Sequence, residues 1–421
     1  LILMTATPMY NTADEIVWLL NLMLTNDRVP TIKRSMLFDK ENNLTDHGRT
    51  TLKQACRGYV SYMRGENPYS FPLRLFPSIN NPKDHRILTK YPTRDIYGQP
   101  IPEESKVKFL EIITSKMSKY QYDVYSSFKR NIRPDMEDDD APEENNDVQN
   151  TMQISNVIYP MENWEKNPRG TYGSTGFERC FKTETKSKTL KVSYQSNIEK
   201  LYGQFLMFDQ LDTYAPKMKA VIEYIRNAKG IVFIYSRYYE SGLIPLACAL
   251  EHAGMNRYSI DGKSRNIMNN IKVSDQFHNK KPKYIILSRR PEISPNNDLE
   301  IQRAKAPENK DGELIKVVIV SKIGTEGIDF KRLREVHILE PWYNLNRAEQ
   351  IIGRAVRTCS HVDLPKSQRN VTIFFHANTC PDPTEESVDL RAYKTSEDKQ
   401  KKIMEVAVSY THLTLPTILL V

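Results

Sequence analysis

The strongest constraint on the fold is the alternation of apolar runs with helical stretches between residues 215 and 380. Five runs rich in Val, Ile and Phe have the length and composition of buried strands. They are IVFIYS (231–236), KYIILS (283–288), IKVVIVS (315–321), EVHIL (335–339) and VTIFFH (371–376). Strands that alternate with helices predict a parallel sheet, built by right-handed crossovers and covered by helices on both faces. We therefore predict an α/β fold for this part of the chain.

The remaining residues have weaker patterns. Residues 1–28 combine a short apolar strand with a helical stripe at Ile16, Val17, Leu20 and Leu24. Residues 29–214 read as an irregular insertion, in which Ser118 and the Gln three positions later have the spacing of a capping box. Residues 381–407 predict a C-terminal helix. The tail 408–421 loses the charge of that helix, and we exclude it from fold reasoning as doubtful, non-native sequence.

Two charged segments lie within the predicted insertion. Residues 134–147 (PDMEDDDAPEENND) contain many carboxylates and no basic residue, so repulsion predicts a flexible loop. A solvated linker is one reading, and an electrostatic gate that competes with DNA for a basic groove is the other. Residues 182–191 (KTETKSKTLK) could contact phosphates, although an exposed surface is the simpler interpretation.

Composition excludes several classes of protein. The formal net charge of +8 favours a polyanionic partner without indicating a preferred sequence. The 5 cysteines form no C-x-x-C pair, which argues against both a disulfide framework and a zinc site. No apolar run approaches the roughly 20 residues that cross a bilayer. We predict no metal ligands and no membrane partner.

Candidate ligand-binding residues follow the predicted strands, because the crevice of a parallel sheet lies at the carboxyl ends of its strands. Ser236 and Arg237 follow the first run, where a hydroxyl and a cation could bind backbone phosphate; an ordinary turn explains them equally well. Ser321 opens the loop of the third run. In that loop Thr325 offers a hydroxyl, Gly327 allows close approach of the main chain to a phosphate, and Asp329 can orient an arginine.

The segment QIIGRAVR (350–357) carries two arginines three positions apart. We predict one helix for it, on which Gln350, Arg354 and Arg357 share a face while the apolar residues turn to a core. Guanidinium groups are always charged and offer planar forks of donors, so the pair suits a phosphate. A surface helix whose arginines only pair with carboxylates is the alternative.

The order of TATP (5–8), FIYS, TEGIDF and QIIGRAVR resembles motifs III, IV, V and VI of superfamily 2 helicases. The segments RGENPYSFPLRLFP (64–77), SKMSKYQYDVY (115–125) and LEPWYNLNRAEQIIGRAVR (339–357) resemble, more narrowly, transcription-linked helicases of large nucleocytoplasmic DNA viruses. Relatives of these helicases include the poxvirus early transcription factor small subunit and nucleoside triphosphate phosphohydrolase I.

The resemblance implies a function and roles for individual residues. It implies a RecA-like second motor lobe at 215–380, and it makes residues 1–28 the C-terminal remnant of a first lobe. ATP and Mg²⁺ would be the cofactors and DNA or RNA the track, with viral RNA polymerase or transcription factors as partners, in a cytoplasmic viral factory or in the virion. The roles that it implies are catalysis for Arg354, Arg357 and Gln350, nucleotide contact for Gly327, Asp329 and Gly353, nucleic-acid contact for Ser236, Arg237, Ser321 and Thr325, and coupling for Thr5 and Thr7.

The chain departs from that family in one respect. A phosphate-binding G-x-x-x-x-G-K-[ST] loop and an acidic magnesium motif should precede TATP, and neither occurs in these residues. We expect the chain to be the C-terminal part of a longer ATP hydrolase, inactive when alone. Three other readings stay open: a restriction or repair translocase, a catalytically dead nucleic-acid scaffold, and a nucleotide-binding protein that does not contact nucleic acid.

Overall fold

The computed structural model describes residues 1–5, 7–61, 70–132, 146–186, 189–262, 265–321 and 328–411. These residues form two compact units. The smaller unit comprises Leu1–Glu66, Trp342–Glu349 and Tyr393–Val421, and the larger unit comprises Asn67–Pro341 and Gln350–Ala392. The predicted boundaries at residues 28 and 214 do not coincide with this division, so the segment 29–214 is shared between the two units.

The smaller unit is helical. Its elements are α1 (Glu15–Asn26), α2 (Arg34–Leu37), α3 (Asp46–Cys56) and the part of α14 (Val388–Thr411) that follows Ala392. Three residues of the predicted stripe of α1, Ile16, Leu20 and Leu24, are buried, and the fourth, Val17, is partly buried. They share a core with Val406 and Tyr410, so the helix continues as far as Thr411, into the tail that the sequence marks as doubtful.

Helix α3 shows how local chemistry sets the packing of this unit. The Thr45 hydroxyl caps the helix by accepting a hydrogen bond from the Gly48 amide at 2.9 Å. A Cβ atom at position 48 would lie 2.0 Å from the Leu37 carbonyl oxygen. Only glycine therefore lets α3 approach the end of α2 this closely.

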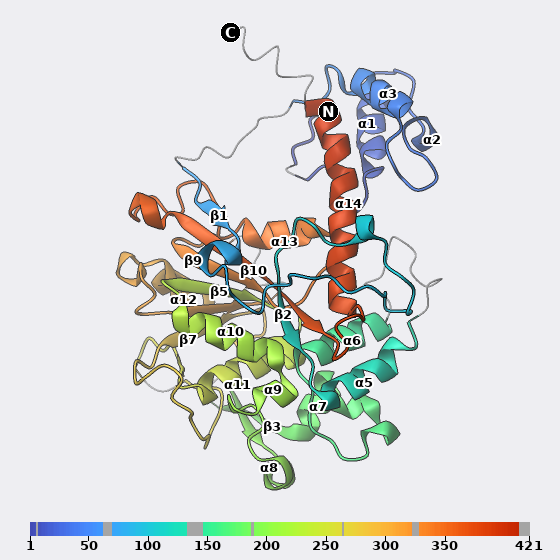
Figure 1. The fold of residues 1–421 in the computed structure, drawn as a ribbon. Helices are drawn as coiled ribbons and strands as arrows, with labels where there is room; N and C mark the ends of the chain where they lie inside the picture. The colour runs from blue at the N-terminus through green and yellow to red at the C-terminus, as the bar shows by residue number, and fades with distance from the viewer. Residues whose placement is uncertain are drawn as a thin grey trace. The chain divides into compact units, whose positions relative to one another are not determined.

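The larger unit contains an eight-stranded sheet in which every pairing is parallel (Figure 1). Its order is β1-β10-β9-β5-β8-β7-β6, and β2 also pairs with β10. The strands are β1 (Leu73–Leu75), β2 (Ile112–Lys116), β5 (Ile231–Tyr235), β6 (Asn256–Arg257), β7 (Lys283–Leu287), β8 (Val317–Val320), β9 (Leu333–Ile338) and β10 (Asn370–Thr379). All five predicted strands are present.

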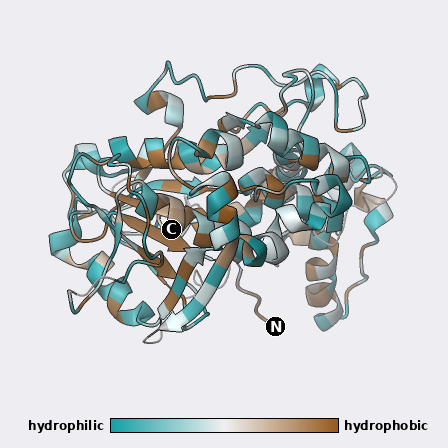
Figure 2. Cartoon of the chain, turned by 90° about the horizontal axis from the view of Figure 1, so that it is seen from below, coloured by the Kyte–Doolittle hydropathy of each residue, from teal (hydrophilic) through white to brown (hydrophobic). Residues whose placement is uncertain are grey.

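Helices lie on both faces of this sheet, which confirms the predicted RecA-like α/β architecture. The helices of the larger unit are α4 (Pro77–Asn80), α5 (Lys119–Lys129), α6 (Asn146–Asn156), α7 (Gly173–Cys180), α8 (Ser196–Tyr202), α9 (Leu211–Tyr214), α10 (Pro216–Asn227), α11 (Ile244–His252) and α12 (Asn297–Lys305). Helix α13 (Leu345–Ile352) crosses the division between the units at Glu349. Brown, hydrophobic residues follow the central strands, whereas the loops are mostly teal (Figure 2).

The residues before 215 belong to the sheet more fully than the sequence suggested. Strands β1 and β2 both pair with β10, and β2 aligns Ile112 with Phe375. The Ser118 hydroxyl caps α5 as predicted, accepting from the Gln121 amide at 3.0 Å. The Gln121 side chain instead donates to the Ile154 carbonyl at 2.8 Å, so the reciprocal half of the capping box is not formed.

The lysine-rich segment 182–191 is not simply an exposed surface. It lies within an antiparallel hairpin of β3 (Phe181–Lys186) and β4 (Thr189–Tyr194). Leu190, Val192 and Tyr194 are buried and alternate with more exposed residues, which is the pattern of a strand with one face on a core. The interleaved lysines and threonines concealed this alternation in the sequence.

Candidate functional site

The carboxyl ends of β5 and β8 present the two predicted serines, and both are buried. Ser236 extends β5 by one residue, with its amide donating to the Val320 carbonyl, and Ser321 likewise extends β8 towards Leu287. The Ser236 hydroxyl donates to a Glu340 carboxylate oxygen at 3.1 Å. The Ser321 hydroxyl accepts from the Tyr239 hydroxyl at 3.3 Å. In this structure both hydroxyls are therefore engaged inside the protein, and their proposed contact with nucleic acid stays a prediction.

Glu340 is the buried carboxylate that organises this edge. It lies two residues after the end of β9, and it also accepts hydrogen bonds from the Arg237 amide and from the Asn156 side chain, the latter at 3.1 Å. Burial raises the pKa of Glu340 above its usual value, and its hydrogen bonds and the nearby charges of Arg237 and Lys217 oppose that rise. The carboxylate thus ties the ends of β5 and β9 to the last residue of α6.

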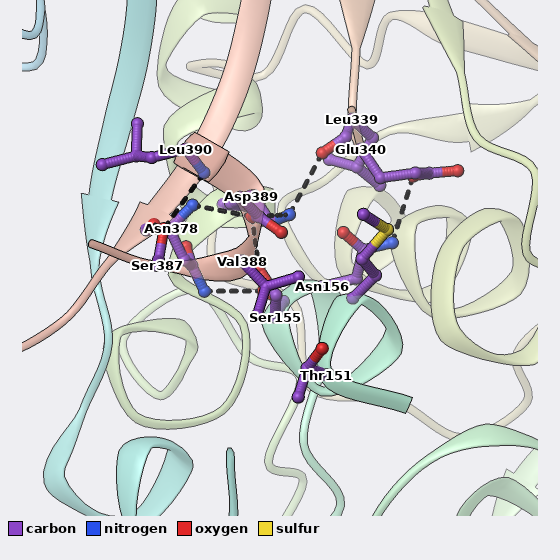
Figure 3. A network of polar contacts seen from close by, with 12 residues as sticks. Thr151, Ser155, Asn156, Leu339, Glu340, Asn378, Ser387, Val388, Asp389 and Leu390 are labelled. Atoms are coloured by element: carbon purple, nitrogen blue, oxygen red, sulfur yellow. Dashed lines mark hydrogen bonds and ion pairs between the residues drawn. The ribbon is translucent and has the colours of Figure 1, made fainter. Parts of the chain in front are cut away.

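A second buried carboxylate, Asp389 at the start of α14, connects helices to β10 in the same way (Figure 3). Its Oδ2 atom lies 2.9 Å from the Lys217 ammonium, and both side chains are almost completely buried, at 1% and 0% exposed. The same oxygen accepts from the Ser155 hydroxyl at 2.5 Å and from the Asn378 amide at 2.9 Å. Lys217 also donates to the Leu339 carbonyl at 3.2 Å.

We call Glu340, Asp389, Lys217, Ser155 and Asn156 the buried polar network. It joins α6, α10 and α14 to the carboxyl ends of three neighbouring strands. Sequence reasoning missed it. The sequence offered one clue. Lys217 lies four positions before Val221 and so falls beside the apolar stripe of α10. A lysine that is buried at such a position usually has an anionic partner.

Arg237 is half-buried at the start of the loop after β5. Its guanidinium donates to the Tyr238 hydroxyl and to the Met152 sulfur, and it lies 4.7 Å from the centre of the Tyr238 ring. Met152 belongs to α6. Helix α6 therefore shapes the surroundings of this predicted phosphate-binding residue as well as those of Ser236.

The predicted helix over 350–357 is wrong in its second half. Helix α13 ends at Ile352, and Arg354 and Arg357 lie in the turns that follow Gly353. The Arg354 amide bonds to the Ile351 carbonyl, a spacing of three residues rather than four. Glycine weakens a helix because ordering its backbone costs more entropy. The apolar part of the prediction is confirmed, since Ile351, Ile352 and Val356 are buried.

The turn nevertheless brings the predicted arginines to the end of the loop that follows β8. The Phe330 amide bonds to the Arg354 carbonyl at 3.4 Å, and Arg357 forms an ion pair with Asp329. The Arg357 side chain remains 42% exposed, and that of Asp329 54% exposed. Arg357 also bonds through Nε to the Gly353 carbonyl at 3.2 Å. Gln350 lies on α13 and is exposed.

The other predicted site residues divide into two groups. Thr325 and Gly327 lie outside the described residues. Thr5 and Thr7 are in the smaller unit, where the Thr7 amide bonds to the Thr5 hydroxyl at 3.1 Å. Among the described residues, no group of three or more His, Cys, Asp or Glu side chains could hold a metal ion. No helix in the described ranges is long and apolar enough to span a membrane.

Comparison with known proteins gives a match in the region that carries Asp329, Arg354 and Arg357. The family model of the helicase conserved C-terminal domain matches residues 297–359. A protein of Acanthamoeba polyphaga mimivirus, named as an ATP-dependent RNA helicase, is 26% identical over 394 residues, which are 91% of this chain and 55% of the relative. An early transcription factor large subunit homolog of African swine fever virus is 25% identical over 416 residues, 90% of this chain and 34% of the relative.

A termination factor NPH-I homolog of African swine fever virus is 30% identical over 184 residues, 39% of this chain and 26% of the relative. The chain thus covers between about a quarter and about half of the lengths of these three relatives. These matches show that residues 297–359 are similar to the helicase conserved C-terminal domain and that most of the chain is similar to helicases and transcription factor homologs of large DNA viruses.

Proposed function

We propose that the chain supplies the second lobe of an ATP-dependent nucleic-acid translocase that serves viral transcription. In this proposal Arg354 and Arg357 donate to the γ-phosphate of an ATP held on another lobe, and Gln350 positions the phosphate or the attacking water. Guanidinium groups that stabilise charge in phosphoryl transfer are worth about 10³ to 10⁵ in rate. DNA or RNA is the track, and viral RNA polymerase or transcription factors are the partners, in the cytoplasm or the virion.

One observation carries this proposal: the pairing of Arg357 with Asp329, beside the backbone contact between Arg354 and Phe330. Two sequence segments that are separate in the chain meet there, and each keeps a partly exposed charged group. An arginine held by a half-exposed carboxylate can exchange that partner for a phosphate, because an ion pair so exposed contributes about 1 kcal/mol or less. Asp329 would then hold Arg357 in position between reaction cycles.

The described residues fit ATP better than they fit Mg²⁺. Arg357 offers a planar fork of donors, which matches phosphate oxygens, and Gly353 leaves room for close approach of the backbone. No described cluster of carboxylates could hold a metal ion, so we assign Mg²⁺ no ligand among the described residues. The ion would be held mainly by the triphosphate and by the other lobe.

The test is ATP hydrolysis by the protein expressed from its full reading frame, measured with and without DNA. Arg354→Ala and Arg357→Ala should each lower turnover by about 10³-fold or more while changing ATP affinity far less. Arg226→Ala, which removes an exposed arginine from α10, is the matched control and should keep wild-type turnover. Unchanged turnover in the Arg354 and Arg357 variants would remove both residues from the site.

Two further outcomes separate the alternatives. Absence of ATPase activity in the wild-type protein would favour a catalytically dead scaffold. Hydrolysis that DNA and RNA leave unchanged would favour a nucleotide-binding protein with no nucleic-acid track. Asp329→Asn sharpens the test, because it should reduce turnover with little loss of stability if Asp329 positions Arg357.

A further inference from the structure

The amino ends of five strands in the larger unit share a feature that the motor does not use. Each strand is preceded, within two positions, by a lysine or an arginine: Lys229 before β5, Lys281 before β7, Lys316 before β8, Lys331 before β9 and Arg369 before β10. Lys283 is itself the first residue of β7. From two positions before each strand to its first residue there is no acidic residue.

The sheet topology collects these cations on one edge. The five strands are neighbours in the order β10-β9-β5-β8-β7, and all of their pairings are parallel, so their amino ends lie side by side. Neighbouring strands are about 4.8 Å apart, so the row extends over roughly 19 Å. We call it the basic edge. It is opposite the carboxyl ends, where the candidate motor residues lie.

Most of these cations are exposed and have no anionic partner. Lys229, Lys281, Lys283 and Lys331 are exposed, and none of the four forms an ion pair within the described part of the chain. Lys316 is half-buried and donates to the Ala228 carbonyl at 2.6 Å. The four exposed ammonium groups are therefore available to a ligand.

Both cations and carboxylates lie near Lys316 in this row. Burial lowers the pKa of Lys316, and the charge of Lys280 lowers it further, whereas Glu335 and Asp311 raise it. Glu335 is only partly available, because its carboxylate lies 3.3 Å from the His337 ring nitrogen. Lys280 and the four exposed lysines outnumber these two carboxylates, and the cavity beside Lys229 adds two arginines and two further carboxylates, which leave the balance positive.

Capping of helix ends explains only one of these lysines. A cation at a helix C-terminus is favoured by the helix dipole, and Lys229 follows the end of α10. Lys281, Lys283 and Lys331 follow loops rather than α-helices, so the dipole does not account for them. Their shared position before buried parallel strands needs another reason.

A neighbouring cavity argues against a small anion as the ligand. A cavity of about 440 Å³ opens beside Lys229, between α10 and the starts of β9 and β10. Its wall combines Arg86, Arg334 and Lys229 with Asp84, Glu223 and Glu335, so its formal charges cancel. The net positive charge lies along the row, and that arrangement suits an extended polyanion rather than a compact one.

We propose that the basic edge binds the phosphate backbone of a second segment of nucleic acid, apart from the track of the motor. Lysine is a mobile point charge, which suits contacts to phosphate that carry no sequence preference. A protein partner fits less well, because the cores of protein interfaces are depleted in lysine and rich in aromatic residues. This inference does not depend on the proposed ATPase activity.

Lysine footprinting tests the proposal without any substitution in the chain. The chain is sparsely acetylated with and without a DNA duplex of about 20 base pairs at about 0.05 M salt, where phosphate contacts are strong. We expect the duplex to protect Lys229, Lys281, Lys283 and Lys331. Exposed lysines elsewhere in the same unit, Lys119, Lys166, Lys182 and Lys200, should react equally in both samples. Equal acetylation of the edge lysines with and without DNA would overturn the proposal.

A charge-neutralised variant gives the quantitative test. The quadruple change of Lys229, Lys281, Lys283 and Lys331 to Gln should reduce the slope of log affinity against log salt by about 0.9 for each phosphate that the protein no longer neutralises. If each lysine neutralises one phosphate, the slope changes by about 3 to 4, and affinity at about 0.1 M salt falls at least tenfold. The matched control replaces Lys119, Lys166, Lys182 and Lys200 with Gln and keeps the wild-type slope.

Two results would contradict the proposal. An unchanged slope in the edge variant would assign DNA binding to other residues. Equal protection of the edge lysines by a polyglutamate peptide and by DNA would indicate an acidic protein partner. Failure of the proposed ATPase leaves all of these readouts unaffected, so the two proposals can fail separately.

Discussion

Charged side chains are buried at one end of the parallel sheet and mostly exposed at the other. At the carboxyl ends, Glu340, Asp389 and Lys217 are buried and direct their hydrogen bonds to one another and to α6, α10 and α14. At the amino ends, four lysines of the basic edge, Lys229, Lys281, Lys283 and Lys331, are exposed and form no ion pairs in the described structure. The first arrangement fixes loops in place, and the second leaves charge available to a ligand. Charge near a strand end is therefore not by itself evidence of a binding site.

The same contrast between buried and exposed polar groups applies among the candidate site residues at the carboxyl ends of the strands. Ser236 and Ser321 occupy the positions that sequence reasoning predicts, but their hydroxyls face protein partners. Under the proposed function, ligand contacts at this edge would fall to groups that remain partly exposed, such as Arg357. The buried polar network would support them by holding the ends of β5, β9 and β10 in register.

The largest effect is expected from removing one partner of the buried ion pair. Lys217→Met leaves the Asp389 carboxylate buried without its cation, and we expect a loss of about 3 to 5 kcal/mol in the free energy of unfolding of the larger unit. Hydrogen exchange of β10 amides in urea measures this loss. Lys219→Met is the matched control, because its partner Asp212 is largely exposed, and it should cost about 1 kcal/mol or less.

A double variant shows whether the cost comes from the uncompensated charge. Lys217→Met combined with Asp389→Asn removes both charges and keeps an acceptor for Ser155, so it should recover much of the lost stability. A double variant no more stable than Lys217→Met would mean that packing, rather than charge, dominates at this edge.

An intermediate effect is expected from Glu340, and it depends on pH. Because burial raises the folded-state pKa of Glu340 above its ordinary value of 4.5, the folded protein retains a proton that the unfolded chain releases. The stability of the wild type should therefore fall relative to Glu340→Gln as pH rises from about 4.5 to the folded-state pKa, by about 1.4 kcal/mol per pKa unit. Urea unfolding of both proteins across this range measures the difference. A wild type that gains stability over Glu340→Gln with rising pH would contradict the assignment.

The smallest effect is expected from the basic edge. The quadruple Gln variant of Lys229, Lys281, Lys283 and Lys331 should unfold within about 0.5 kcal/mol of the wild type for each substitution, because exposed residues without ion pairs contribute little. The same exchange measurement used for Lys217 checks this. A loss of several kcal/mol would show that these lysines, like Lys217, are structural.

Sequence reasoning succeeded where the signal is local and periodic. The runs around Val232, Ile285 and Val318 predict buried strands because their apolar residues are continuous, and all three lie in the sheet. Reasoning failed where the outcome depends on distant partners. Nothing near Leu73 or Ile112 indicates that β1 and β2 pair with β10, because the partner lies more than 250 residues along the chain.

The sequence predicted which residues form the candidate site, but it predicted their arrangement only in part. The spacing of Arg354 and Arg357 suggested one helical face, yet Gly353 ends the helix before either arginine. What brings Arg357 to Asp329 is the chain after the helix, where the neighbouring residues Val356 and Phe330 are both buried. The roles of these residues in catalysis stay predictions.

The amino-acid sequence by itself determined the class of the fold, the order of the five central strands along the chain and the family to which the motifs point, because apolar periodicity and short motifs are local properties. Tertiary structure alone decided which charges are buried and which are free. A lysine before a strand and a lysine in a helix read alike in sequence. Only the parallel pairing of the strands aligns the first kind along an exposed edge, and only the folded chain brings Lys217 of α10 to Asp389 at the start of α14 in a buried ion pair.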